Sequence, residues 1–164
     1  MNYTEFSAAF EASQHRHDAW MEVLYSKAVE LAVLFRTSIE APEAVSVVGV
    51  PTPVVQVVET TDDPTKMARL SRARLDINSE GVLPFTITVL FPNGSGYFRH
   101  FIFLAVRTRD GQAEYAMWDA PDARRLKEKE WYAGAQILTV MNFELHSYFN
   151  HAPELGEFNL SSVR

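Results

Sequence analysis

The first part of the chain has apolar residues at helical spacing. Steps of three, four or seven form one stripe, which comprises Phe6, Phe10, His17, Trp20, Leu24, Ala28, Leu31 and Phe35. Thr4 or Ser7 can cap such a helix, and Glu5 suits its positive end. An unbroken helix over residues 5–37 would be roughly 48 Å long at about 1.5 Å per residue, which exceeds the diameter expected for a domain of this size. We therefore expect either a break near residues 13–18 or a projecting helix that packs against a second copy.

The next part of the chain is rich in valine, over residues 44–50 and 54–60. β-branched residues suit a packed, pleated surface, so both runs are predicted to be strands. The Pro-Thr-Pro at 51–53 cannot lie in a central ladder because proline lacks the N–H donor, and we expect a hairpin loop or an edge kink there. Residues 61–70 are predicted to include a short helix, and the alternating residues 71–78 are predicted to form a strand.

A meander of three strands is predicted over residues 85–91, 97–107 and 113–119. The connections contain Asn-Gly and Asp-Gly, which tolerate positive φ and are the strongest short hairpin signals. A two-residue turn at Asp110-Gly111 fixes the register: Arg107 lies opposite Glu114, Ala105 opposite Ala116, and Phe103 opposite Trp118. The middle strand is apolar on both faces, so we expect it to be central and covered on both sides.

The last predicted element is a helix that starts near Pro121 and ends at about residue 149. Its apolar stripe comprises Leu126, Gly134, Ile137, Leu138, Met141, Leu145 and Tyr148. Residues 137–145 also fit a strand, and residues 152–164 are predicted to form an extended tail. The fold class is therefore α+β, a single domain over 1–164 with a mostly antiparallel sheet of about six strands, a long N-terminal helix and a long C-terminal helix.

Composition and charge narrow the function classes. The 164 residues are 47% hydrophobic and 22% charged, as in a globular protein with its own core. The net charge of -6 argues against nucleic acid and anionic membrane surfaces as partners, since both bind positive surface. There is no cysteine, no signal-peptide pattern at the start and no apolar run near the roughly 18 residues that span a bilayer, so a cytoplasmic location is expected.

The titratable residues form no catalytic or metal-binding motif. His15 and His17 are two residues apart, so on a helix they point in different directions. His146 and His151 with Glu154 are the nearest approach to a metal set, and we predict structural roles for them and for His100, with no bound metal. The paired carboxylates Asp62, Asp63, Asp119 and Asp122 precede or flank prolines, where aspartate caps helices. Since phosphate-loop and nucleophile motifs are also missing, we predict no cofactor and no enzymatic activity.

Arginines are the candidate ligand-binding residues. On the predicted strands they are Arg72, Arg74, Arg99, Arg107 and Arg109. Arg72 and Arg74 lie on one predicted strand, and Arg99, Arg107 and Arg109 lie on another. If these two strands were neighbours and presented the same face, the guanidinium groups would surround Phe101 and Phe103, an arrangement that holds phosphate-bearing ligands. The opposing interpretation is that Arg107 pairs with Glu114 across the strands, which contributes roughly 0.2–1 kcal/mol.

Three functions are consistent with this pattern. The first is a non-catalytic protein-interaction module of the regulator, chaperone or inhibitor type, which forms a homo-oligomer and binds a protein partner. The second is a small-molecule binding protein with an apolar pocket between the sheet and the C-terminal helix. The third is a binder of a phosphate-bearing ligand through the arginine face. We predict the first, because of the long N-terminal helix, the 12% aromatic content and the missing catalytic motif.

Overall fold

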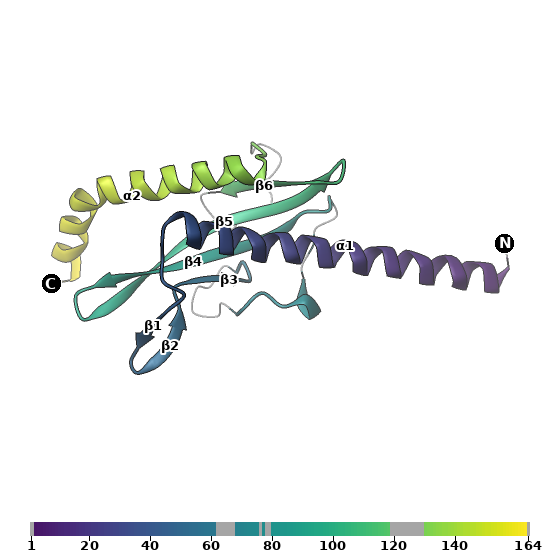
Figure 1. Cartoon of the computed structure of the whole chain (residues 1–164), viewed down its shortest axis with the longest axis horizontal. Helices are drawn as coiled ribbons and strands as arrows, with labels where there is room; N and C mark the ends of the chain where they lie inside the picture. The colour runs from purple at the N-terminus through teal and green to yellow at the C-terminus, as the bar shows by residue number, and fades with distance from the viewer. Residues whose placement is uncertain (1, 62–67, 76, 78–79, 119–129, 164) are drawn as a thin grey trace.

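The computed structural model describes residues 2–61, 68–75, 77, 80–118 and 130–163. The elements are α1 (Tyr3–Ser38), β1 (Ala44–Val47), β2 (Val50–Pro53), β3 (Val55–Val58), the 3-10 helix η2 (Arg72–Arg74), β4 (Leu83–Asn93), β5 (Gly96–Arg109), β6 (Gln112–Trp118) and α2 (Gly134–Val163). Over these described residues the fold is α+β, with six strands in two antiparallel sheets and two α-helices, as the hydrophobic pattern predicts at this level (Figure 1).

Helix α1 is continuous for 36 residues, without a break at residues 13–18. Its cap is Asn2, one residue before the helix, and not Thr4 or Ser7. The Asn2 side chain accepts a hydrogen bond from the Glu5 N–H at 3.1 Å, and the Glu5 carboxylate accepts one from the Asn2 N–H at 2.8 Å. This reciprocal pair is a capping box, which satisfies two of the free N–H groups at the helix start. The N-terminal half of α1 extends well beyond the rest of the molecule (Figure 1).

The larger sheet has four strands in the order β3-β4-β5-β6, so β5 is an interior strand. Its register with β6 confirms the one predicted from the turn, with the pairs Arg107–Glu114, Ala105–Ala116 and Phe103–Trp118. Asp110 and Gly111 have φ of 51° and 74°, the conformation of a two-residue turn with positive φ at both positions.

The valine-rich run at 44–50 is not the single strand that we predicted. It is interrupted by a turn at Val48 and Gly49, with φ of 50° and 77°, so the chain reverses and β2 pairs with β1. Glycine adopts positive φ without steric cost, which explains why the chain turns at this point. Pro51 and Pro53 lie inside β2, which is tolerated because β2 has a neighbour on one side only.

Within the segment 71–78, the described residues 71–75 and 77 do not form the predicted strand. The Ser71 hydroxyl accepts a hydrogen bond from the Ala73 N–H at 3.3 Å, and this local bond stabilises the turn of η2 in place of extended backbone. For the short helix predicted over 61–70, residues 62–67 lie outside the described residues. Arg69 forms an antiparallel bridge with Val58, so the described end of that segment is extended rather than helical.

Helix α2 begins at Gly134, later than predicted, because Tyr132 pairs with Tyr115 of β6 through two backbone hydrogen bonds. Leu126 lies outside the described residues. The alternative of a strand over 137–145 is wrong. We predicted a long C-terminal helix, but over the residues whose side chains are described, 134–150, it is short, about 17 residues against the 36 of α1. The bounds of α2 include residues 152–163, so the backbone there is helical where we predicted an extended tail.

Both α-helices pack on the same face of the large sheet. The buried core on this face comprises Leu24, Ala28, Leu31 and Phe35 of α1, Phe85, Ile87 and Val89 of β4, Ile102, Leu104 and Val106 of β5, and Ile137 and Met141 of α2. On the opposite face Thr86, Thr88 and Ala105 are buried, but Phe101 and Phe103 are only partly buried. The interior position of β5 is thus confirmed, whereas its cover is more complete on the helix side.

Candidate interaction surfaces

The five candidate arginines do not form one site. Arg99, Arg107 and Arg109 share one face of β5, but Arg99 and Arg107 are separated by about 26 Å, since strands rise roughly 3.3 Å per residue. Arg72 belongs to η2 and lies against α1, which covers the other face of the sheet. Arg74 also belongs to η2, where only its backbone is described. A single anion site made of all five is therefore not assembled, and ligand binding by any one of them stays a prediction.

Arg107 is used for structure. Its guanidinium group bonds the Glu114 carboxylate at 2.8 Å through both Nε and Nη2, and its Cζ atom lies 4.0 Å from the ring centroid of Trp131. The ion pair, in which Nε and Nη2 both contact Oε2 of Glu114, and the cation–π contact together fix the side chain in place. This cross-strand pair is the structural role that the sequence register predicts.

Arg72 is also paired. Its Nη2 atom lies 3.1 Å from the Glu22 carboxylate, and its Cζ atom lies 4.9 Å from the ring centroid of Tyr25. Both partners belong to α1, so these contacts attach η2 to that helix. Arg99 and Arg109 are exposed at opposite ends of β5.

His100 belongs to an aromatic cluster between β5 and α2. Its ring centroid lies 4.7 Å from that of Tyr148, and Phe149 contacts Phe91 edge-on at 4.9 Å. Burial lowers the pKa of His100 from its usual value, because the charged imidazolium is desolvated. A neutral, packed histidine agrees with the structural role predicted for it.

Tyr115 connects β6 to α1. Its hydroxyl donates a hydrogen bond to the Lys27 carbonyl at 3.2 Å. Burial, and then the charge of Glu30, raise the pKa of Tyr115 to about 12. The phenol is therefore held neutral as a donor inside the core, which is a structural role.

The remaining titratable side chains that the structure describes do not group as metal ligands. Among the described side chains no group of three or more His, Cys, Asp or Glu residues could hold a metal ion. His146 is hydrogen-bonded to Asn150 at 3.1 Å. Asp62, Asp63, Asp119 and Asp122, and the side chains of His151 and Glu154, lie outside what the structure describes, so their predicted roles are untested.

The cavities are small or shallow. One of about 240 Å³ lies between β5 and α2 beside His100, Met141 and Tyr148. Another of about 180 Å³ lies between α1 and β3. Both are below the roughly 300 Å³ at which drug-sized ligands become buried, and a third, of about 560 Å³ beside Trp131 and Tyr132, is larger but widely open to solvent. The volumes of the described cavities give only modest support to the small-molecule alternative, which stays a prediction.

The most exposed apolar residues of α1 lie on the part that extends from the body. We call residues 3–19 the projecting half and residues 20–38 the packed half. Along the projecting half Tyr3, Phe6 and Phe10 are 86%, 59% and 65% exposed. They continue the spacing of three and four residues that leads to buried Leu24 in the packed half. The stripe is thus uncovered along the length of helix that leaves the body.

Comparison of the chain with protein-family models, with curated proteins and with solved structures finds no match. None of the helices, over the described residues, combines the length and apolar character needed to cross a membrane.

Proposed function

We propose that this protein is a non-catalytic interaction module that self-associates through the projecting half of α1. The observation that carries the proposal is the exposed stripe of Tyr3, Phe6 and Phe10 on a helix that no other described element contacts there. Neighbouring monomers would bury these rings, and helices that share a 3-4 spacing of apolar residues pack side by side.

A second copy suits this surface for two reasons. The projecting half is about 25 Å long at about 1.5 Å per residue, so two copies can lie along each other over several turns. Its charges are also unevenly placed: Glu5 and Glu11 make the tip acidic, whereas the charges of Arg16 and Asp18 near the body cancel. Antiparallel pairing keeps the two acidic tips apart and places each beside the neutral part of the other helix, which avoids like-charge repulsion and sets the orientation.

The test compares two substitutions on opposite sides of the same helix. Phe10→Glu places a charge on the apolar stripe, whereas Ala8→Glu places the same charge on the opposite, exposed side. We measure molar mass by size-exclusion chromatography with light scattering over a range of concentrations. The wild type and Ala8→Glu should have the mass of a dimer or a larger oligomer, and Phe10→Glu should be monomeric.

Two results would contradict the proposal. The first is a wild-type chain that stays monomeric at tens of micromolar. This would limit the association free energy to about 7 kcal/mol at most. Equal oligomerisation of the Phe10→Glu and wild-type proteins would show that self-association uses another surface. Circular dichroism of both variants checks that the helix is still formed.

A further inference from the structure

Strand β5 is longer than β6, and its excess length leaves one edge of the large sheet open. The last pair between the two strands is Phe103–Trp118, so residues 97–102 of β5 have β4 on one side and none of the described strands on the other. Figure 1 shows β4 and β5 extending together beyond β6. We call residues 97–102 the open edge.

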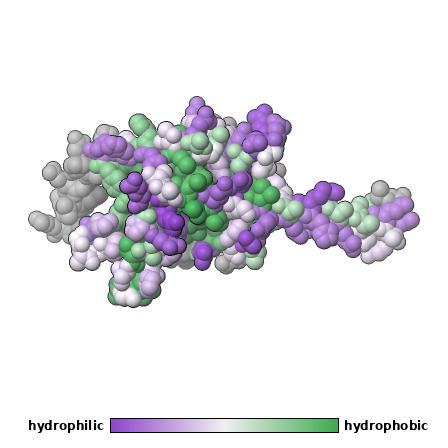
Figure 2. Space-filling view, viewed as in Figure 1, coloured by the Kyte–Doolittle hydropathy of each residue, from purple (hydrophilic) through white to green (hydrophobic). Residues whose placement is uncertain are grey.

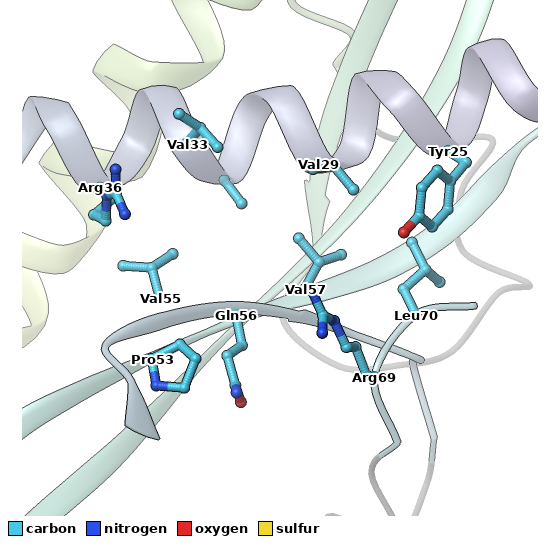
Figure 3. Close-up of a pocket in the computed structure, with 11 residues that line it drawn as sticks. Tyr25, Val29, Val33, Arg36, Pro53, Val55, Gln56, Val57, Arg69 and Leu70 are labelled. Atoms are coloured by element: carbon cyan, nitrogen blue, oxygen red, sulfur yellow. The ribbon is translucent and has the colours of Figure 1, made fainter. Parts of the chain in front are cut away.

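The opposite edge of the sheet, along β3, is occupied by the chain itself. Residues 68–70 run beside it, and the Leu70 N–H bonds the Val57 carbonyl at 3.1 Å. Figure 3 shows Arg69 and Leu70 next to Val57, with α1 crossing above them. Figure 2 shows hydrophobic surface across the middle of the body, on the face that α1 crosses, and there α1 itself packs against β3. A partner strand is therefore better accommodated at β5 than at β3.

The open edge presents the backbone groups of three residues. A two-residue turn joins β4 to β5, so the even-numbered residues of β5 bond to β4. The odd-numbered residues bond to β6 as far as Phe103. The N–H and C=O groups of Tyr97, Arg99 and Phe101 therefore point outward, and they make no hydrogen bond within the part of the chain that the structure describes.

A cavity of about 240 Å³ lies beside the open edge, on the face of the sheet that α2 covers. It is lined by apolar, aromatic and acidic side chains, which include Met117, Met141 and Leu145, the rings of His100 and Tyr148, and Glu144. Residues directly opposite each other in a ladder share a face of the sheet. A strand that pairs with the open edge therefore directs the side chain opposite His100 toward this cavity.

Glu144 determines which side chain the cavity favours. It is exposed on α2, and no cation pairs with it among the described residues. Burial lowers the pKa of His100, so the ring beside it is neutral and does not compensate the carboxylate. A lysine has an apolar stem that suits the methionines, and an ammonium group that can bond Glu144 and lie against the ring of Tyr148. The net charge of -6 favours a basic partner as well.

We propose that the open edge binds an extended segment of a partner protein as an added strand on β5, with a lysine side chain in the cavity under α2. The backbone of the segment pairs with Tyr97, Arg99 and Phe101, and the lysine bonds Glu144. Strand addition obtains affinity from the main-chain bonds and specificity from alternate side chains. A second copy of β5 fits less well. The two-fold pairing that uses all three residues places Arg99 directly opposite the same arginine of the other copy, which is destabilising.

The first test uses a fluorescein-labelled peptide of sequence Thr-Val-Thr-Lys-Thr-Val-Thr and its analogue Thr-Val-Thr-Gln-Thr-Val-Thr. Binding to the full chain is measured by fluorescence anisotropy. The lysine peptide should saturate the protein, and the glutamine analogue should bind about tenfold more weakly because it cannot form the ion pair. Glu144→Gln should remove this preference, whereas the matched variant Glu11→Gln, an exposed glutamate of the projecting half, should keep it.

The second test concerns the strand pairing itself. Arg99→Pro removes an outward N–H without removing a bond to β4, and proline is tolerated on an edge strand. Its control is Arg99→Ala, which loses the same side chain but keeps the N–H. The lysine peptide should bind Arg99→Pro at least about tenfold more weakly than Arg99→Ala, while the far-ultraviolet spectra of the two variants agree. If Arg99→Pro does not fold, Glu144→Gln still decides the question.

Four outcomes would overturn the proposal: no saturable binding of the lysine peptide up to about 1 mM, equal binding of both peptides, an unchanged preference in Glu144→Gln, or equal binding by Arg99→Pro and Arg99→Ala. A lower molar mass of Arg99→Pro than of Arg99→Ala without peptide would assign the open edge to a second copy, which also overturns it. Repeating the titration with Phe10→Glu separates this inference from the proposed function, because the open edge should bind peptide equally well in a monomer.

Discussion

Helix α1 has one periodic pattern and two environments. In the packed half, Leu24, Ala28, Leu31 and Phe35 are buried against β4 and β5. In the projecting half the same spacing continues with Phe6 and Phe10, which are exposed. Since most helical stability in proteins comes from packing of an apolar face, the projecting half, whose stripe is exposed, depends on its continuity with the packed half and on its capping box. Periodicity therefore identifies a helix face but not what covers that face.

The largest difference in stability between the two halves should come from replacing one phenylalanine by alanine in each half. Phe35→Ala removes a fully buried ring and leaves a cavity, so the free energy of unfolding should fall by about 3–5 kcal/mol. Phe10→Ala should change the stability of the monomer by less than about 0.5 kcal/mol, because the ring is exposed. Urea unfolding at dilutions where both proteins are monomeric measures the difference. Comparable losses would mean that the projecting half is packed within a single chain.

A pH experiment should show how the packed half is attached to the sheet. Because the pKa of Tyr115 is raised to about 12 in the fold, the folded state keeps its proton where the unfolded tyrosine, with a pKa near 10, has lost it. The contribution is full below pH 10 and is lost as the pH rises from about 10 to 12. The free energy of unfolding should therefore fall over this range by up to about 3 kcal/mol at about 1.4 kcal/mol per pKa unit.

The control for this pH dependence is Tyr115→Phe, which cannot ionise. Its stability should fall less steeply above pH 10 than that of the wild type, although it lacks the hydrogen bond to Lys27 at every pH. Parallel curves for the two proteins would show that Tyr115 is not held neutral against α1.

The elements that sequence predicts well are those with local signals. The register of β5 with β6 follows from Asp110-Gly111, since a two-residue turn leaves only one pairing. The apolar stripe of α1 likewise predicts a helix over residues 5–37, although it left a break at 13–18 open and the cap is Asn2 and not Thr4 or Ser7. Where a signal is weak, other contacts decide the structure. A local bond between Ser71 and Ala73 forms a turn where alternation predicted a strand, and the long-range pairing of Tyr132 with Tyr115 precedes the start of α2.

The interaction surfaces are harder to predict from the sequence. Strand position alone groups the five arginines, but Arg72 lies in η2 against α1, so the predicted common face does not exist. The cavity beside the open edge of β5 forms only because α2 packs over the sheet there, a long-range arrangement with no local signal. The strand lengths are the one available hint, because the predicted strand 97–107 extends past its predicted partner 113–119.

A single methyl group added beside the junction of the two halves of α1 should lower the stability of the protein. Gly81 has φ of 78°, and a Cβ there would lie 2.9 Å from Cζ2 of Trp20, the first residue of the packed half. Gly94 has φ of 62° with nothing within 4 Å. Gly94→Ala should cost only the left-handed backbone strain of about 1–2 kcal/mol, and Gly81→Ala should cost about 1 kcal/mol more as Trp20 shifts. Thermal unfolding compares the two variants, and equal losses would show that Trp20 moves freely.

The smallest effect should come from the cap at the tip of the projecting half. Asn2→Ala removes the side-chain acceptor of the capping box, which costs about 1 kcal/mol locally. Because the first turns pack against nothing described within the chain, this cost should appear as faster amide hydrogen exchange there, with little change in global unfolding of the monomer. Ser13→Ala, an exposed substitution further along the same half, is the matched control and should not accelerate exchange. A loss of about 1 kcal/mol in global stability would instead show that the two halves of α1 unfold as one unit.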